Sequence, residues 1–381
     1  MYSQQHDTME AAKLRAIAFY LPQYHPIPEN DAWWGKGFTE WTNVAKAKPR
    51  FKGHYQPHLP ADLGFYDLRL PETRAAQADL ARAYGIHGFC YYHYWFNGKR
   101  LLERPFNEVL NSGEPDFPFC LCWANENWTR RWDGAEQEIL MQQVYDEASD
   151  RKHLQWLAQA FADPRYIRVD DKPLFLVYRA SQIPNPAKTV EVWREEAQRL
   201  GIGELFLARV ESTSSEHTDP HVLGFDAAVE FQPDWMKLGR RAQSGKKYNL
   251  LRSLGLAEQG YRDNKIYDYQ AVVTNMLAKP DPPYLRFPCV TPAWDNAARR
   301  KNNATIIQSS TPELYGDWLK ANAEKLLKSP EQKGLIFINA WNEWAEGNHL
   351  EPCQKWGSAY LEQTRQVLNE YASRFDHHPQ L

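Results

Sequence analysis

Two glutamates stand three residues apart at the end of an apolar run near the C-terminus. The run GLIFINA (334–340) leads into Trp341, Asn342 and Glu343, and Glu346 follows. A turn starting at Glu343 would bring positions i and i+3 to one side, so that both carboxyl groups share a pocket. Enzymes that cleave glycosidic bonds with retention of configuration have their two carboxyl groups roughly 5 to 5.5 Å apart, whereas those that invert the configuration have them roughly 6.5 to 9.5 Å apart. The short spacing favours a retaining pair; in the alternative reading Glu346 caps a helix or pairs with a surface cation.

A second group of polar and aromatic residues follows the first predicted strand, in FYLPQYHPIPENDAWWGKGFTEWTNVAKAKPRFKGHYQPHLPADLG. His25, His54 and His58 make an unconvincing metal site, because no clear carboxylate completes the ligand set. We therefore expect recognition of sugar hydroxyls, without metal or other cofactor; the alternative is that these residues tie a long loop to the protein body. The predicted binding residues here are Tyr20, Gln23, His25, Glu40, Trp41, Asn43, His54 and Gln56.

Aromatic residues also cluster with Asn, His and Glu in YYHYWFN and CWANENWTRRW. Flat apolar faces beside hydrogen-bonding groups suit the two-sided surface of a sugar ring, although ordinary core packing is the alternative. The remaining predicted binding residues are Tyr92, Tyr94, Trp95, Trp123, Asn125, Glu126, Trp294, Trp341 and Asn342.

Eight short apolar segments must position these side chains, and several are apolar throughout, as parallel strands covered on both faces are. Helical patterns such as 71–85, 189–201, 311–328 and 357–375 lie between them, so the alternation predicts an α/β fold, a single (β/α)8 barrel. We expect the barrel to span 13–375 after a disordered tail, 1–12, with 232–285 as a lid or insertion. The predicted strands are 14–21, 86–95, 117–124, 173–179, 204–210, 225–231, 287–294 and 334–341.

The lengths of the connections indicate which end of the barrel carries the active site. Helix-to-strand links such as YGIHG and LGIGEL are short, whereas the strand-to-helix links 22–70, 125–147 and 232–266 are long and rich in Trp, His, Asn and Glu. Barrel enzymes keep their chemistry in the loops at the carboxyl ends of the strands.

Composition excludes several classes of protein. The 381 residues carry a net charge of only −3, which gives no electrostatic argument for nucleic acid. No apolar stretch reaches 18 residues, so no membrane span is expected. The five cysteines have no metal-ligand spacing and are expected to be reduced core residues. The first dozen residues show no export signal, which predicts a cytoplasmic location unless a leader was trimmed.

Five motifs together resemble one family. YLPQYH, WWGKGFTEWTNV, YYHYWF, CWANENWTRRWDG and AWNEWAEGNHLEP look like the WbsX-type family, which is labelled glycosyltransferase and occurs in polysaccharide gene clusters. That family is similar in turn to family 99 glycoside hydrolases, endo-acting α-mannosidases and α-mannanases on a (β/α)8 barrel. The sequence departs from those hydrolases in its strand-one segment.

The resemblance to family 99 implies that Glu343 and Glu346 are catalytic and that the substrate is a polysaccharide or oligosaccharide. Glu343 would act as a base on the sugar's own 2-hydroxyl, a 1,2-anhydro sugar would form, and Glu346 would serve as acid and then base. The leading hypothesis is thus a retaining endo-acting hydrolase of α-linked mannose or rhamnose polymers. A glycosyltransferase of O-antigen or capsular polysaccharide synthesis is the alternative, although the sequence lacks Asp-x-Asp and G-x-G-x-x-G. A non-catalytic sugar-binding module is a third possibility.

Overall fold

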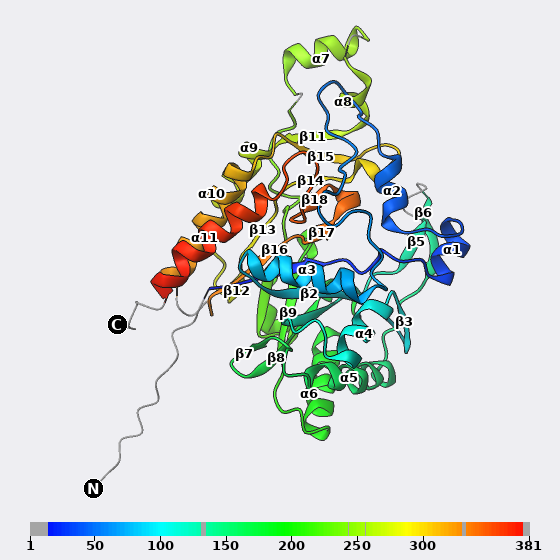
Figure 1. The fold of residues 1–381 in the computed structure, drawn as a ribbon, viewed down its shortest axis with the longest axis vertical. Coiled ribbons are helices and arrows are strands. Elements are labelled where there is room, and N and C mark those ends of the chain that lie inside the picture. The colour runs from blue at the N-terminus through cyan, green and yellow to red at the C-terminus, as the bar shows by residue number, and fades with distance from the viewer. Residues whose placement is uncertain (1–13, 131–134, 243, 256, 330–332, 376–381) are drawn as a thin grey trace.

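The computed structural model describes residues 14–130, 135–242, 244–255, 257–329 and 333–375. Its centre is a nearly closed ring of parallel strands, which confirms the predicted (β/α)8 barrel (Figure 1). Each of the eight predicted apolar segments contributes to the ring. In order round the ring the strands are β12 (Arg286–Phe287), β10 (Ala227–Glu230), β9 (Phe206–Glu211), β8 (Lys172–Val177), β4 (Phe119–Trp123), β2 (Ile86–Phe96), β1 (Arg15–Tyr20), β16 (Leu335–Ile338) and β13 (Cys289–Val290).

The seventh barrel position differs from the single strand predicted over 287–294. Two short strands, β12 and β13, flank Pro288; β12 pairs with β10 and β13 pairs with β16. Proline has no backbone N–H and cannot donate to a ladder, so the strand is interrupted there. The Pro288 carbonyl nevertheless accepts a hydrogen bond from the Phe337 amide at 2.8 Å, which helps to close the ring.

Aromatic side chains fill the barrel interior. The Phe19 ring lies 5.6 Å from Phe337 and 5.7 Å from Phe231, and Phe287 lies 6.2 Å from Phe337 and 6.0 Å from Phe206. These rings come from five different strands or strand ends, so each contact ties together segments that are distant in sequence.

Helices cover the outer face of the ring, and Figure 1 shows α10 and α11 running side by side along one flank. The predicted helices are found within a few residues of their expected ends; for example, α10 begins with Thr311 as N-cap and Pro312 as first residue. The helices are α1 (Pro28–Trp34), α2 (Glu40–Lys46), α3 (Pro71–Ala83), α4 (Arg104–Ser112), α5 (Glu147–Phe161), α6 (Pro186–Arg199), α7 (Lys246–Ser253), α8 (Gln259–Asp263), α9 (Tyr269–Leu277), α10 (Pro312–Leu327) and α11 (Ala359–Phe375).

The predicted lid or insertion, 232–285, contains α7, α8, β11 and α9. β11 pairs with a strand of the next loop to form a small sheet, and α7 projects beyond it at the top of Figure 1. Whether the segment acts as a lid stays a prediction, and the predicted tail 1–12 lies outside the described residues. The remaining strands are β3 (Lys99–Leu101), β5 (Trp128–Arg130), β6 (Ala135–Met141), β7 (Arg168–Val169), β11 (Lys265–Asp268), β14 (Trp294–Asp295), β15 (Thr305–Gln308), β17 (Asn342–Glu343) and β18 (Asn348–His349).

All five cysteines are buried and free of disulfides. Among the helices that the structure describes, none has the length and apolar character needed to cross a bilayer.

Candidate active site

A cleft of about 390 Å³ opens at the carboxyl end of the barrel. Its walls come from residues at or just past the ends of seven barrel strands, among them Leu21 after β1, Tyr178 after β8 and Phe231 after β10. The lining mixes aromatic rings with polar and charged side chains, and Trp34 at the end of α1, Trp128 and Trp235 are among the aromatic residues. This composition suits the apolar faces of sugar rings.

Glu343 and Glu346 lie on a tight hairpin that follows β16. β17 pairs with β18 in an antiparallel ladder, and a 3₁₀ turn over Trp344–Glu346 connects them. Because a 3₁₀ helix has three residues per turn, both carboxyl groups project to the same side and both line the cleft. Gly347 closes the turn at φ 57°, where an added Cβ would lie 3.0 Å from the Cβ of Asp295.

Arg299 holds the two carboxyl groups together. Its Nη2 lies 2.8 Å from Glu343 Oε2, and its Nη1 lies 2.6 Å from Glu346 Oε1. Its Nε contacts a third carboxylate, Glu40 Oε2 at the start of α2, at 3.2 Å. The Glu40 side chain is 0% exposed, so it supports the site from behind the cleft wall. One planar guanidinium therefore fixes three carboxyl groups, two from the hairpin and one from α2.

Burial governs the protonation of the pair. It raises the pKa of Glu343 to about 8, with Arg299 opposing that rise and the charges of Glu346 and Glu40 adding to it. Burial also raises the pKa of Glu346, again against Arg299. A cluster of three carboxyl groups with one guanidinium thus retains a proton near neutral pH, as a pair that divides acid and base roles requires.

A buried carboxyl group, Glu351, supports the hairpin from behind. It accepts hydrogen bonds from Trp344 Nε1 at 2.6 Å, the Tyr66 hydroxyl at 2.8 Å and Gln77 Nε2 at 2.6 Å. Burial raises its pKa to about 7, although these hydrogen bonds favour the charged form. Trp344 also stacks on His349 at 3.7 Å, so the turn between the two glutamates is rigidly packed.

The structure brings part of the predicted set into the cleft and places the rest elsewhere. Gln23 belongs to the lining, and its buried amide nitrogen has no hydrogen-bond partner among the described residues, which leaves it able to donate to a ligand. The predicted residues that line the cleft are Gln23, Tyr92, Tyr94, Glu126, Trp294, Glu343 and Glu346. Those that do not are Tyr20, His25, Glu40, Trp41, Asn43, His54, Gln56, Trp95, Trp123, Asn125, Trp341 and Asn342.

Strand parity explains the aromatic residues that the cleft lacks. Successive strand residues point to opposite faces, and Phe19 points inward, so Tyr20 points outward and donates to Gln77 Oε1 of α3 at 2.6 Å. Trp341 belongs to the same outer layer, with its ring 5.1 Å from that of Phe89.

The same reasoning applies on β2 and at the end of β4. Tyr92 and Tyr94 line the cleft, and Trp95, between Tyr94 and the strand end, stacks instead on His153 of α5 at 4.7 Å. Trp123 packs against His153 at 4.9 Å, and its indole N–H donates to the Trp95 carbonyl at 3.2 Å. These two tryptophans fill the space between barrel and helices.

Two predicted asparagines tie loops to one another. Asn342 accepts from the Leu21 amide at 2.7 Å and donates to the Leu21 carbonyl at 3.0 Å, which joins the ends of β1 and β16. Asn125 makes the equivalent pair of bonds with the backbone of Arg179, at 2.8 Å each. Both side chains therefore spend these hydrogen-bonding groups on the protein backbone, which is a structural role.

Three more predicted residues lie in or behind the first loop. Trp41 donates to the Tyr66 carbonyl at 2.8 Å and packs 5.7 Å from Trp344, behind the hairpin. His25 is 2% exposed, and burial lowers its pKa to about 4. Asn43 lies in α2 and is half-buried.

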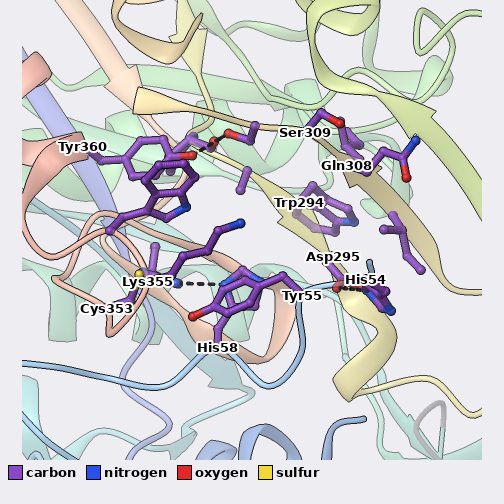
Figure 2. A pocket seen from close by; sticks show the side chains of 18 of the residues that line it. His54, Tyr55, His58, Trp294, Asp295, Gln308, Ser309, Cys353, Lys355 and Tyr360 are labelled. Atoms are coloured by element: carbon purple, nitrogen blue, oxygen red, sulfur yellow. Dashed lines mark hydrogen bonds and ion pairs between the residues drawn. The ribbon is translucent and has the colours of Figure 1, made fainter. Parts of the chain in front are cut away.

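His54 and Gln56 lie beside a smaller recess of about 110 Å³, which shares Trp294 with the cleft. In Figure 2, His54 points at Asp295, and the two make a contact of 2.7 Å between Nε2 and Oδ2. Gln56 donates to the same carboxylate oxygen at 2.5 Å. Both side chains therefore bind Asp295, the residue next to Trp294, and do not contact the cleft.

Sequence reasoning missed Arg299, although a signal existed. Glutamates placed in a buried pocket need a cation, and Arg299 and Arg300 follow the seventh predicted strand by only a few residues. Within the described ranges, no group of three or more His, Cys, Asp or Glu side chains could hold a metal ion, and a metal-free mechanism stays a prediction.

Comparison with known sequences places this geometry in context. A family model described as "Glycosyltransferase WbsX" matches residues 16–364. Two proteins of Xanthomonas campestris pv. campestris, each called "Uncharacterized protein WxcX", are 45% identical over 353 residues, which is 92% of this chain and 49% of theirs. The chain thus spans about half the length of these relatives.

Solved structures share the fold at low sequence identity. A GH99 endo-alpha-mannosidase from Bacteroides thetaiotaomicron matches with a TM-score of 0.54 and 16% identity, over 96% of this chain and 99% of its own. A "Glycoside hydrolase-like protein" matches with a TM-score of 0.59 and 14% identity, over 94% of this chain and 95% of its own. At these identities the likeness shows the barrel fold alone.

Proposed function

The chain belongs to the family described as "Glycosyltransferase WbsX", and for this member we propose a different reaction: it is a retaining, endo-acting glycoside hydrolase. Its substrate would be an α-linked polysaccharide of manno configuration, built of mannose or rhamnose. The observation that carries the proposal is the pair Glu343 and Glu346, which share one guanidinium at the carboxyl end of the eighth barrel strand.

In the first step Glu343 would take the proton of the sugar's 2-hydroxyl. The 2-oxygen then attacks C1 from the face opposite the leaving group and forms a 1,2-anhydro sugar. The C1–O bond to the leaving group breaks, and Glu346 gives that oxygen its proton. Glu343 ends the step protonated and Glu346 ionised, so charge balances within the pair.

In the second step the roles reverse. Glu346 would remove a proton from an incoming water, whose oxygen attacks C1 and breaks the bond between C1 and O2. The released 2-oxygen recovers its proton from Glu343. Two displacements at C1 retain its configuration, and both glutamates return to their starting states.

The first step requires Glu343 ionised and Glu346 protonated when substrate is bound. In the ligand-free cleft the raised pKa of about 8 keeps the proton largely on Glu343 at neutral pH. Arg299 already contacts Glu343, so loss of its second contact, to Glu346, would favour a proton on Glu346 and leave the guanidinium to stabilise ionised Glu343, which is the productive arrangement. The high pKa also makes Glu343, once ionised, a stronger base than an exposed glutamate.

The experiment compares two variants on α-mannosides or α-rhamnosides with good and poor leaving groups. Glu346→Gln should be rescued in its first step by a good leaving group, which needs no protonation, and Glu343→Gln should not. Each loss should be roughly 10² to 10⁴ in rate on substrates with poor leaving groups. Glu114→Gln, an exposed change at the other end of the barrel, is the matched control.

Two further measurements separate the proposed route from an ordinary one. A 2-deoxy substrate should fail with the intact enzyme, because the internal nucleophile is missing. If a 2-fluoro sugar with a good leaving group left a covalent adduct on Glu343, mass spectrometry would show the added mass, and the 1,2-anhydro route would be wrong.

A glycosyltransferase is the second candidate, and the description of the matching family favours it. It predicts product only when a nucleotide sugar is supplied with the acceptor polysaccharide. Incubation of the chain with mannans and rhamnans, with and without nucleotide sugars, therefore distinguishes the two. Release of oligosaccharides without any nucleotide sugar supports the hydrolase.

A further inference from the structure

Exposed apolar side chains concentrate on one segment near the cleft. Of the eleven large hydrophobic residues that are exposed in the described chain, five fall between 235 and 254. Met236, Leu250 and Leu254 are 62%, 59% and 61% exposed. Soluble proteins expose single apolar residues everywhere, but a cluster of this kind marks an interaction surface.

The same segment is basic. Residues 236–257 contain six Lys or Arg and no Asp or Glu, whereas the whole chain carries a net charge of −3. Lys237, Arg240 and Arg241 are exposed, and none of them takes part in an ion pair among the described residues. Net charge averages over the molecule, so it hides this local concentration.

The geometry of α7 places its leucines together. Leu254 directly follows α7, and its amide donates to the Leu250 carbonyl at 3.0 Å, which continues the helical turn. At 3.6 residues per turn, Leu250, Leu251 and Leu254 therefore lie on one side, and all three are exposed. α7 extends beyond the small sheet at the top of Figure 1 and stands clear of the barrel. Arg240 Nε donates to the Ser244 hydroxyl at 2.7 Å and that hydroxyl donates to the Arg241 carbonyl at 2.9 Å, so both arginines lie where the chain enters α7. We define the α7 surface as Arg240, Arg241, Leu250, Leu251 and Leu254.

We propose that the α7 surface docks on an anionic lipid bilayer. Leucines on a projecting helix insert into the boundary between headgroups and acyl chains, while neighbouring Lys and Arg contact anionic headgroups. A soluble anionic polymer would use the cations and leave the leucines in water. The bilayer is the partner that uses both halves of the surface.

The docking would orient the cleft. The segment leaves the barrel after β10, and Trp235, next to Met236, lines the cleft with Glu343 and Glu346. The α7 surface and the mouth of the cleft therefore belong to the same end of the barrel. A docked molecule would receive glycan that is held at the membrane surface. This inference does not depend on which reaction the cleft performs.

The test is flotation of the purified chain with vesicles. With vesicles of phosphatidylcholine and phosphatidylglycerol at 7:3, the chain should float at about 0.1 M salt, and with pure phosphatidylcholine it should not. Binding should weaken as salt rises, because surface charges are screened. Failure to float with the anionic vesicles, or equal flotation with both kinds, would overturn the proposal.

Paired variants separate the two halves of the surface. Arg240→Gln with Arg241→Gln should lower the partition coefficient by roughly fivefold per charge. Leu250→Ser with Leu254→Ser should lower it by about tenfold or more, because the inserted apolar area is lost. Val222→Ser is the control: it removes a residue that is 74% exposed at the opposite end of the barrel, and binding should not change.

A second copy of the chain is the competing occupant, and sedimentation detects it. If the chain dimerises without lipid and the Leu250→Ser, Leu254→Ser variant does not, the surface is a self-association site and the proposal is wrong. All variants change exposed residues, so circular dichroism and thermal unfolding should match those of the parent chain.

Discussion

Replacement of Arg299 by Met should destabilise the protein in a way that depends on pH. The guanidinium contacts Glu343, Glu346 and Glu40 at 2.8, 2.6 and 3.2 Å, and its side chain is 13% exposed. Removal of one partner from a buried ion pair costs about 3 to 5 kcal/mol, because an uncompensated charge stays buried. We expect a loss of that size in the free energy of unfolding at pH 8.

The loss should shrink at pH 5. Burial already raises the pKa of Glu343 and Glu346 above 4.5, and without Arg299 both should rise further. A carboxyl group whose folded pKa exceeds its unfolded value stabilises the fold at low pH and loses that contribution as pH rises. The difference between parent and variant should therefore fall to about 1 to 2 kcal/mol at pH 5.

Urea unfolding at pH 5 and pH 8 measures both values. Arg104→Met is the matched control, since Arg104 makes an exposed contact of 2.7 Å to Glu108 in one helix, and it should cost less than about 0.5 kcal/mol at either pH. Arg299→Lys should recover only part of the loss, because a point charge cannot span three carboxylates. If Arg299→Met lowered the free energy of unfolding equally at both pH values, or by less than about 1 kcal/mol at pH 8, the reasoning would be refuted.

Three more results are expected. Burial raises the pKa of Glu351 from 4.5 to about 7, so the contribution of Glu351 to the free energy of unfolding falls by about 3 kcal/mol as pH rises through that window. In Glu351→Gln, urea unfolding should not show this pH-dependent fall. If parent and variant instead differ by a constant amount between pH 4.5 and 8, the prediction is wrong. Gly347→Ala should lower activity on any cleaved glycan and cost about 1 to 2 kcal/mol, because φ is 57° and the Asp295 Cβ is 3.0 Å from the added carbon; wild-type activity in this variant would show that the hairpin tolerates movement. Chelator treatment should leave activity unchanged, whereas a loss that a divalent ion restores would favour the transferase.

The sequence was sufficient for the fold because its signals were local. Apolar runs bounded by turn residues and caps such as Thr311–Pro312 repeat along the chain, and each one predicts a strand or helix without knowledge of the others. The interruption at Pro288 was visible in principle, since proline cannot donate to a ladder, but the apolar run around it suggested one continuous strand.

The site was harder, because a strand that is buried on both faces does not reveal which face points inward. Tyr92 and Trp95 look equally suited to a sugar, yet Tyr92 lines the cleft and Trp95 packs on α5. Contacts between distant loops carry no local signal either. Arg299 reaches Glu40 across 259 positions of the sequence, and only the closed barrel brings the two together.

The divided seventh strand gives the ring a seam. β12 and β13 each contribute two residues to the ladder, one toward β10 and the other toward β16, and Pro288 supplies no amide between them. If the barrel opens locally, the break that costs the fewest hydrogen bonds is here, and the opened form is a curved sheet with its two edges at this point. Amide hydrogen exchange should therefore be fastest, among the barrel strands, at 286–290. The loop that carries Trp294 and Arg299 begins directly after this seam. The wall of the cleft that supplies Arg299, the cation between Glu343 and Glu346, is thus also the one with the weakest attachment to the ring.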